Sequence, residues 1–223
     1  MSLVIAIVGA ESTGKTALAT ALAGRLAQET GWSCVAVPEY LREWCERIGR
    51  TPRIEEQAHV ATEQRRRIEA AAQSHRIVVA DTTPLMTAVY SRLVFNDRSL
   101  DAAAAQWHAR AVAQTLVTAL DLPWVADGLQ RDGEHVRMPV DAALRELLAA
   151  HRIGWSGVSG AGDARLACAL DAVSPLLRTQ APANSGLFTR LAARDAAQPD
   201  WRWDCDCDVP ECEHRLRMRN PSP

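Results

Sequence analysis

Eight consecutive residues near the N-terminus have the types and the spacing of a phosphate-binding loop. They run Gly9-Ala10-Glu11-Ser12-Thr13-Gly14-Lys15-Thr16 and match the pattern Gly-x-x-x-x-Gly-Lys-Ser/Thr. An apolar run precedes them and an Ala- and Leu-rich segment follows, so backbone N–H groups and a helix N-terminus would face phosphate oxygens. We predict that a nucleoside triphosphate, ATP or GTP, is bound through Gly9, Glu11, Ser12, Thr13, Gly14, Lys15 and Thr16.

The end of this run carries the reactive side chains. Lys15 is the only lysine among the 25 basic residues of the chain, and its compact ammonium group suits phosphate oxygens inside a tight loop. We expect Lys15 to act on the β- and γ-phosphates and the Thr16 hydroxyl to bind Mg²⁺. Asp81 closes the apolar run 77–81 and is predicted to hold the same ion. The alternative is that Asp81 only caps the segment that follows it.

Two more carboxylates follow predicted strands. Glu39 comes directly after the strand predicted at 34–37, and the carboxyl ends of parallel strands line the ligand crevice of such sheets. We predict that Glu39 orients or deprotonates an acceptor hydroxyl group near the γ-phosphate. A surface ion pair with Arg42 is the alternative. Asp127 ends a strand predicted at 122–127 and is placed at the same edge, with a similar alternative.

A polar loop at 128–139 holds two arginines and two glycines. Phosphoryl-transfer enzymes need a movable segment that brings guanidinium groups to the transferred group and excludes water. Arg131 is predicted to do this as a catalytic residue, and Arg137 as a nucleotide-binding residue. The alternative is a solvated loop without a role in the chemistry.

The elements that position these residues alternate between strand and helix. Apolar runs predict strands at 3–8, 34–37, 77–81, 122–127 and 153–158. Helical periodicity predicts helices at 15–29, 54–74, 101–120 and 140–151, and another from 162. Strands that alternate with helices imply parallel pairing and right-handed crossovers. We therefore predict an α/β P-loop NTPase fold, a doubly wound, mainly parallel sheet of about five strands with helices on both faces, over 1–178.

The amino-acid composition limits the classes of partner that this chain could bind. The formal net charge is -2, so binding to nucleic acid is not expected. No apolar run is long enough to cross a bilayer, and a cytoplasmic protein is the expectation. A homo-oligomer is possible. Residues 179–223 are predicted to form a partly ordered C-terminal extension, in which Cys205, Cys207, Cys212 and His214 could hold Zn²⁺. The spacing of these four residues differs from common zinc sites, and free thiols are the alternative.

Four segments together resemble the kinase domain of NadR-type nicotinamide riboside kinases and related small P-loop ATPases. They are residues 9–16, the Pro38-Glu39-Tyr40-x-Arg42-Glu43 segment, residues 81–90 and Pro123-Trp124-Val125-Ala126-Asp127-Gly128. The resemblance covers about residues 3–175. It implies ATP-dependent phosphorylation of the 5′-hydroxyl group of nicotinamide riboside, which yields nicotinamide mononucleotide for NAD salvage. Gln130 stands where the family has an arginine, so Arg131 would have to replace it.

The resemblance also suggests how a nucleoside would be held. The expected acceptor site consists of Glu39, Tyr40, Arg42, Trp124 and Asp127. The aromatic rings of Tyr40, Trp44 and Trp124 are near the predicted edge of the sheet and could stack on a nicotinamide ring. Packing inside the protein is the alternative for the two tryptophans. Two other functions stay open at this stage: a nucleotide-gated regulatory ATPase that acts on a partner protein, and a kinase for another nucleoside or a nucleotide.

Overall fold

Five parallel strands place the predicted phosphate-binding loop at the carboxyl edge of one sheet. The computed structural model describes residues 2–125 and 133–178, and within them the strand order is β2-β3-β1-β4-β5. Neighbouring strands all pair in parallel. The strands are β1 (Leu3–Val8), β2 (Cys34–Val37), β3 (Ile77–Asp81), β4 (Gln114–Thr118) and β5 (Ser156–Val158). The predicted doubly wound α/β fold is confirmed.

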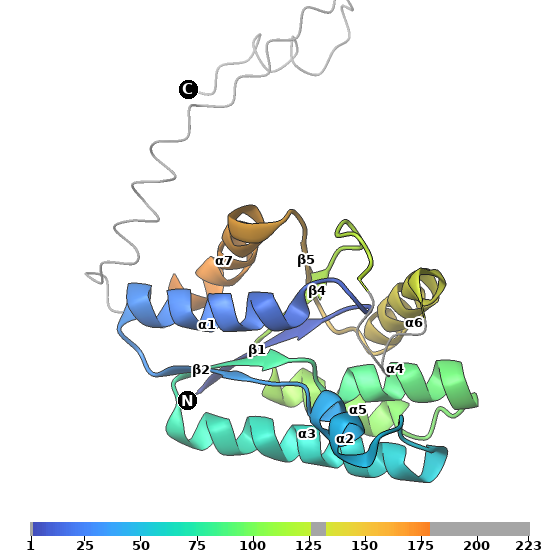
Figure 1. Ribbon diagram of the computed structural model, residues 1–223. Coiled ribbons are helices and arrows are strands. Elements are labelled where there is room, and N and C mark those ends of the chain that lie inside the picture. The colour runs from blue at the N-terminus through green and yellow to red at the C-terminus, as the bar shows by residue number, and fades with distance from the viewer. Residues whose placement is uncertain (1, 126–132, 179–223) are drawn as a thin grey trace, which may run out of the picture. The chain divides into compact units, whose positions relative to one another are not determined.

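Helices cover both faces of the sheet, as Figure 1 shows. One face is covered by α1 and α7, and the other by α3, α4, α5 and α6, while α2 packs on α3. The helices are α1 (Lys15–Thr30), α2 (Tyr40–Ile48), α3 (Ile54–Ser74), α4 (Pro84–Phe95), α5 (Asp101–Ala111), α6 (Arg137–Ala150) and α7 (Gly162–Arg178), with a 3-10 turn, η2, at Glu134–Val136.

The central strands owe their position to continuous apolar sequence. Every residue of β1 and β3 is buried, as expected for parallel strands that are covered on both faces. Leu18, Leu22 and Leu26 recur at every fourth position of α1 and are all buried, so this helix presents one apolar stripe to the sheet. Gly31 ends α1 with a φ of 71°, the left-handed conformation that glycine adopts at no steric cost.

The fourth strand is not where the sequence pattern placed it. The segment 114–118, predicted as the end of a helix over 101–120, is β4, and the segment predicted as a strand at 122–127 is not a strand over its described part. The helix α5 ends at Ala111. Thr115, Leu116, Val117 and Thr118 are buried, and β-branched side chains of this kind pack well in a sheet. The Ala-rich composition of α5 concealed this change of structure.

Smaller differences concern two helices and the last strand. The sequence analysis did not predict α2 and α4, and β5 spans three residues rather than the six predicted at 153–158. The helix predicted from 162 is confirmed as α7. Asp127, Arg131 and the extension with Cys205, Cys207, Cys212 and His214 lie outside the described residues. Among the helices that the structure describes, none is both long and apolar enough to span a bilayer.

Candidate functional site

The phosphate-binding loop connects the end of β1 to the start of α1. Gly14 adopts a φ of 75° and forms the N-cap of α1, and Gly9 adopts a φ of 151°. Both values are readily reached by glycine and only rarely by other residues. The amide groups at the start of α1 and the positive end of the helix therefore face the loop, which gives an anion-binding geometry. The Lys15 ammonium group donates a hydrogen bond to the Ala10 carbonyl oxygen at 2.8 Å.

Thr118, at the end of β4, fixes the conformation of this loop. Its hydroxyl oxygen lies 2.7 Å from that of Thr13, and both side chains are fully buried. A Cβ atom on Gly9 would lie only 2.1 Å from the Thr118 hydroxyl oxygen, so this contact requires glycine there. The sequence analysis missed Thr118 because it placed residue 118 in a helix.

Asp81 lies beside the loop and is hydrogen-bonded to Thr16, the residue with which it is predicted to share a metal ion. The Thr16 hydroxyl donates to Asp81 Oδ2 at 2.5 Å. The Asp81 side chain is buried, and its Oδ1 atom has no hydrogen-bond partner among the described residues. Burial raises the pKa of the Asp81 carboxyl group, and the Thr16 hydrogen bond and the charges of Lys15 and Arg42 partly offset this effect. A carboxylate and a hydroxyl group at this distance fit Mg²⁺, which prefers oxygen ligands.

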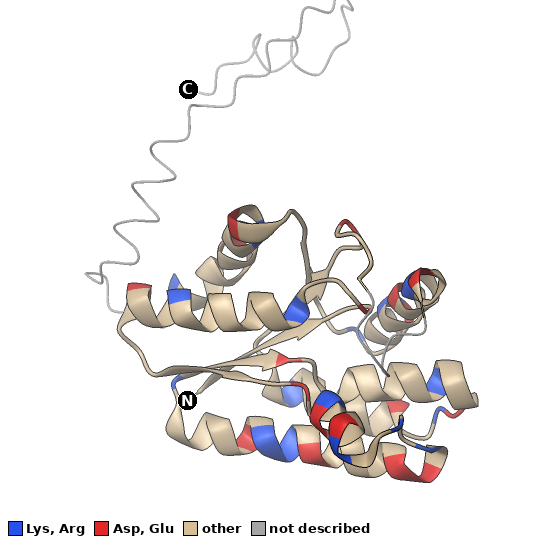
Figure 2. Cartoon of the chain, in the orientation of Figure 1, with Lys and Arg blue, Asp and Glu red and all other residues tan. Residues whose placement is uncertain are grey.

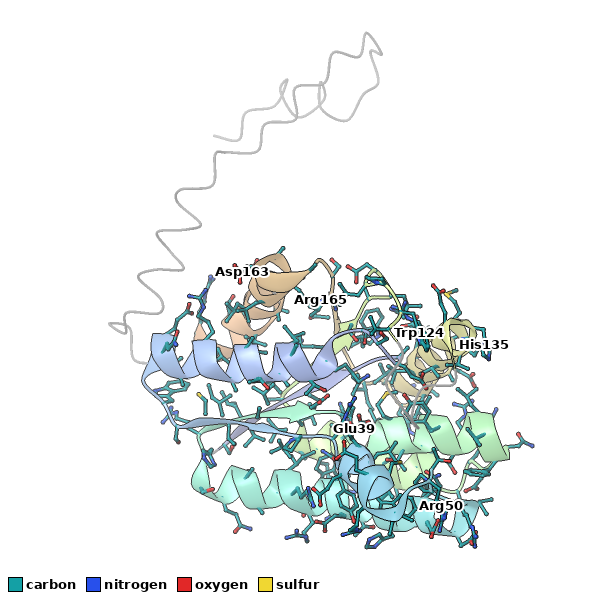
Figure 3. All side chains as sticks on the ribbon, viewed as in Figure 1. Glu39, Arg50, Trp124, His135, Asp163 and Arg165 are labelled. Carbon is teal, nitrogen blue, oxygen red and sulfur yellow. The ribbon has the colours of Figure 1, made fainter. Side chains whose placement is uncertain are left out.

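A cavity of about 230 Å³ opens next to the loop and contains the predicted acceptor carboxylate. Glu39, the residue before α2, lines it together with Arg42. Glu11, Ser12 and Lys15 of the phosphate-binding loop line the same cavity. Figure 3 shows Glu39 between α1 and α2. The structure thus brings Glu39 and Arg42 together with the residue expected to contact the γ-phosphate.

The other walls of the cavity consist of residues to which the sequence analysis gave no role in the site. They belong to α2, the loop after it, the start of α3 and the second half of α4, and comprise Leu41, Cys45, Thr51, Pro52, Gln57, Tyr90, Val94 and Phe95. Most are apolar or aromatic, as in many pockets for small molecules. The α4 contribution was hidden because the helix itself was not predicted.

An ion pair holds the loop that forms one of these walls. Arg50 donates two hydrogen bonds to the Glu56 carboxylate, at 2.6 and 2.8 Å, and its guanidinium carbon lies 5.2 Å from the centre of the Trp44 ring. The Arg53 amide also donates to Glu56. These bonds lower the pKa of Glu56 to about 2. Because they join both ends of the segment 50–56, they fix the position of Thr51 and Pro52 in the cavity wall.

Tyr40, predicted to contact the acceptor, is instead part of the packing between α2 and α3. Its ring is buried, and the guanidinium carbon of Arg67 lies 4.4 Å from the ring centre. Its hydroxyl group accepts a hydrogen bond from Arg47 at 3.1 Å, and the residue does not line the cavity. Arg67 also forms an ion pair with Glu43. Charged residues of both signs lie on α2 and α3 (Figure 2). Tyr40 therefore stabilises the wall without forming it.

Trp124 and Arg137 lie on the other side of the phosphate-binding loop. The amide of Val125 donates to the Ser12 hydroxyl oxygen at 2.8 Å, so the segment 122–125 lies against the loop. Arg137 is buried and donates to the Leu122 carbonyl oxygen at 2.9 Å. Figure 3 shows Trp124 on the side of α6, and Trp124 does not line the cavity around Glu39. Its expected place in the acceptor site is thus not supported, and contact between Arg137 and a phosphate group stays a prediction.

Comparisons with solved structures bear out the fold. A NadR protein in complex with NR is 24% identical, with a TM-score of 0.62, and a NadR protein in complex with NAD and AMP-PNP is 23% identical, with a TM-score of 0.61. Each match covers 78% of this chain, which spans about half the length of those proteins. Thymidylate kinase from Ehrlichia chaffeensis matches over 78% of this chain and 98% of its own, at 14% identity and a TM-score of 0.51.

Sequence comparisons give the family. No match was found among curated proteins. The family model described as an AAA domain matches residues 4–165, which include the phosphate-binding loop, Asp81 and every residue that lines the cavity around Glu39. This chain therefore belongs to the AAA domain family of P-loop proteins.

Proposed function

We propose that this chain transfers the γ-phosphoryl group of ATP to a hydroxyl group of a nucleoside. The observation that carries the proposal is the cavity beside the phosphate-binding loop, which Glu39 shares with Lys15. A regulatory ATPase needs a phosphate-binding loop but has no need for a second site with a carboxylate beside it. A kinase needs both, because the acceptor must approach in line with the transferred group.

Each residue of the site has a separate role in the proposed phosphoryl transfer. The Lys15 ammonium group neutralises negative charge on the β- and γ-phosphates. The Glu39 carboxylate orients the acceptor hydroxyl group and takes its proton while the new oxygen–phosphorus bond forms and the bond to the β-phosphate oxygen breaks. Thr16 and Asp81 would hold Mg²⁺, which would supply positive charge against the phosphate groups during transfer.

The finer proposal is that the acceptor is nicotinamide riboside, phosphorylated on its 5′-hydroxyl group, with the activity located in residues 1–178. It is supported by the sequence resemblance to NadR-type kinases and by the similarity in fold to a NadR protein that was crystallised with NR. The apolar and aromatic walls of the cavity, which include Tyr90 and Phe95, suit a planar ring.

A panel of nucleosides tests both levels of the proposal. Purified chain is incubated with ATP, Mg²⁺ and one nucleoside at a time, and ADP and the mass of the nucleoside product are measured. We expect ADP to form only with an accepted nucleoside, whose mass rises by one phosphoryl group. ATP turnover that no nucleoside changes would contradict the proposal and favour an ATPase that acts on a partner protein.

Two carboxylates near α2 allow a matched test of Glu39. Glu39→Gln removes the base from the cavity, and we expect it to lower kcat on the order of a hundredfold or more. Glu43→Gln makes the same chemical change on α2, where Glu43 pairs with Arg67 at the surface and does not line the cavity. It should leave kcat close to that of the unmodified chain. Equal losses in the two variants would remove the case for Glu39 as the base.

A further inference from the structure

Gln57 is a polar residue buried in the wall of the acceptor cavity. It lies in the first turns of α3, close to the Arg50–Glu56 ion pair. Only 6% of its surface is exposed, and the residue lines the cavity around Glu39. Since most of the neighbouring wall residues are apolar, among them Leu41, Val94 and Phe95, a buried amide here needs a reason. Buried polar groups are normally hydrogen-bonded, and an unpaired one lowers stability.

One end of the Gln57 amide is held by the protein. Its Nε2 atom donates to the Pro52 carbonyl oxygen at 3.3 Å. Because a carbonyl oxygen can only accept a hydrogen bond, the amide nitrogen must face Pro52. This contact leaves Oε1 as the other polar atom of the amide, and among the described residues the Gln57 side chain makes no hydrogen bond besides the one to Pro52.

A second glutamine of α3, Gln64, provides a comparison, because both polar atoms of its amide are hydrogen-bonded to the protein. Gln64 is also buried, but both ends of its amide bond to the backbone. Its Oε1 accepts from the Tyr40 amide at 2.7 Å, and its Nε2 donates to the Pro38 carbonyl oxygen at 3.4 Å. Gln64 thus joins α3 to the segment before α2, whereas Gln57 keeps its acceptor atom available.

We propose that Gln57 selects the base of the acceptor nucleoside, by accepting a hydrogen bond from an uncharged N–H group on that base. The inference rests on the proposed nucleoside kinase activity and adds the class of base that the site takes. A neutral carboxamide or amino group supplies the donor. A carboxylate at the same position has no hydrogen to donate, so its oxygen would face the Gln57 carbonyl oxygen without a hydrogen bond between them.

The test uses two nucleosides that differ only in this group: nicotinamide riboside and its analogue with a carboxylate in place of the carboxamide. Binding is measured by calorimetry and phosphorylation by kcat/KM. For the unmodified chain we expect a preference for the carboxamide on the order of tenfold to a hundredfold. Gln57→Met, which keeps the length of the side chain but not its oxygen, should weaken binding of the carboxamide and reduce the preference severalfold or more. The KM for ATP should not change.

Gln64→Met is the matched control, because it removes a buried amide from the same helix but from outside the proposed contact. We expect it to lower the melting temperature and to leave the ratio between the two nucleosides unchanged. If Gln57→Met also keeps the ratio while the carboxamide is still phosphorylated, the role of Gln57 is wrong and the kinase proposal stands. If neither nucleoside binds to the unmodified chain, the proposed acceptor and the role of Gln57 both fail.

Discussion

The phosphate-binding loop and the cavity around Glu39, the proposed acceptor site, share Glu11, Ser12 and Lys15, but they are built in different ways. The loop is one continuous segment between β1 and α1, fixed by Thr118 and bordered by Asp81, whose side chains are buried. The cavity is formed by residues from α2, α3, α4 and the connections between them. One of its walls depends on the Arg50–Glu56 ion pair, which is partly exposed.

This difference predicts which substitutions the loop and the cavity can each tolerate. Close contacts, such as the approach of Thr118 to Gly9, restrict the conformation of the loop. We therefore expect most substitutions in the loop to affect nucleotide binding. The cavity walls consist of separate side chains on separate elements, and each can change the acceptor without disturbing the loop. One fold can host many functions, because function depends on the residues of the site. Changes in the loop should therefore alter ATP kinetics, and changes in the cavity should alter acceptor kinetics.

The largest effect is expected at Lys15. Lys15→Ala removes the ammonium group that we propose to stabilise charge on the transferred phosphate, and we expect kcat/KM for ATP to fall on the order of a thousandfold. Lys15→Arg should lose nearly as much, because the planar guanidinium group does not fit where the compact ammonium group does. Arg25→Ala removes a positive charge from the exposed side of α1 and should change little. Full activity in Lys15→Arg would show that charge alone suffices.

Asp81→Asn should separate activity from stability. We expect kcat to fall on the order of a hundredfold, because the amide is a weaker ligand for Mg²⁺ than the carboxylate. The melting temperature at neutral pH should rise by a few degrees, because burial raises the pKa of Asp81 and the charged form therefore destabilises the folded state. Activity assays and thermal unfolding of the same sample measure both effects. A variant that is less stable and equally active would contradict this account.

The stability gain of Asp81→Asn should depend on pH. A carboxyl group with a raised pKa binds its proton more tightly in the folded chain than in the unfolded chain, so the unmodified chain loses stability as pH rises from the unfolded pKa, about 3.9, through the folded value. The difference between variant and unmodified chain should be largest at neutral pH and vanish below about pH 4. Denaturant unfolding across this range, without added Mg²⁺, measures it.

Much of the fold could be predicted because its signals are local. The strands β1 and β3 are continuous apolar runs, and α1 has an uninterrupted stripe of leucines that ends at a glycine. The sequence pattern did not predict β4, which begins at Gln114, three residues after the Ala-rich helix α5 ends at Ala111. Neither glycine nor proline marks that change, so composition favoured a helix. The error also moved the predicted carboxyl edge of the strand from Thr118 to Asp127.

The residues of the candidate site also differ in how well the sequence predicted them. Lys15, Thr16 and Asp81 follow from a contiguous motif and from the end of an apolar strand, and the structure brings them together. Glu39 was predicted from its place after β2 and lines the cavity, whereas Tyr40, the next residue, points into the packing between helices. Glu39 precedes α2 and Tyr40 is its first residue, so their side chains face different directions, and the sequence does not show which of them faces the cavity and which packs on α3. Gln57 has no sequence signal at all.

Thr118→Val tests the contact that holds the loop. Valine keeps the shape of threonine but removes the hydroxyl group next to Thr13, and we expect the KM for ATP to rise about tenfold while the KM for the nucleoside stays the same. Thr118→Ser should restore most of the affinity. The control is Thr115→Val on the same strand, where the lost partner is His108 at 2.8 Å. It should cost similar stability without a change in the KM for ATP.

Glu56→Gln is expected to have the smallest effect and to act only on the acceptor side. The change removes the charge that pairs with Arg50 and loosens the wall at Thr51 and Pro52, so the KM for the nucleoside should rise severalfold while the KM for ATP is unchanged. Because the pKa of Glu56 is lowered to about 2, the unmodified ion pair persists throughout the range from pH 5 to 9, and the ratio of the two KM values should be constant there.

Glu55→Gln is the control for this change, since it removes an exposed carboxylate one position away on α3. It should leave both KM values unchanged. If Glu56→Gln raised the KM for ATP as much as that for the nucleoside, the wall and the loop would be coupled. The proposed difference between a loop that tolerates few substitutions and a cavity whose walls can change independently of it would then be wrong. If only the acceptor is affected, the connection between α2 and α3 is a part of the molecule that can change substrate preference without a loss of nucleotide binding.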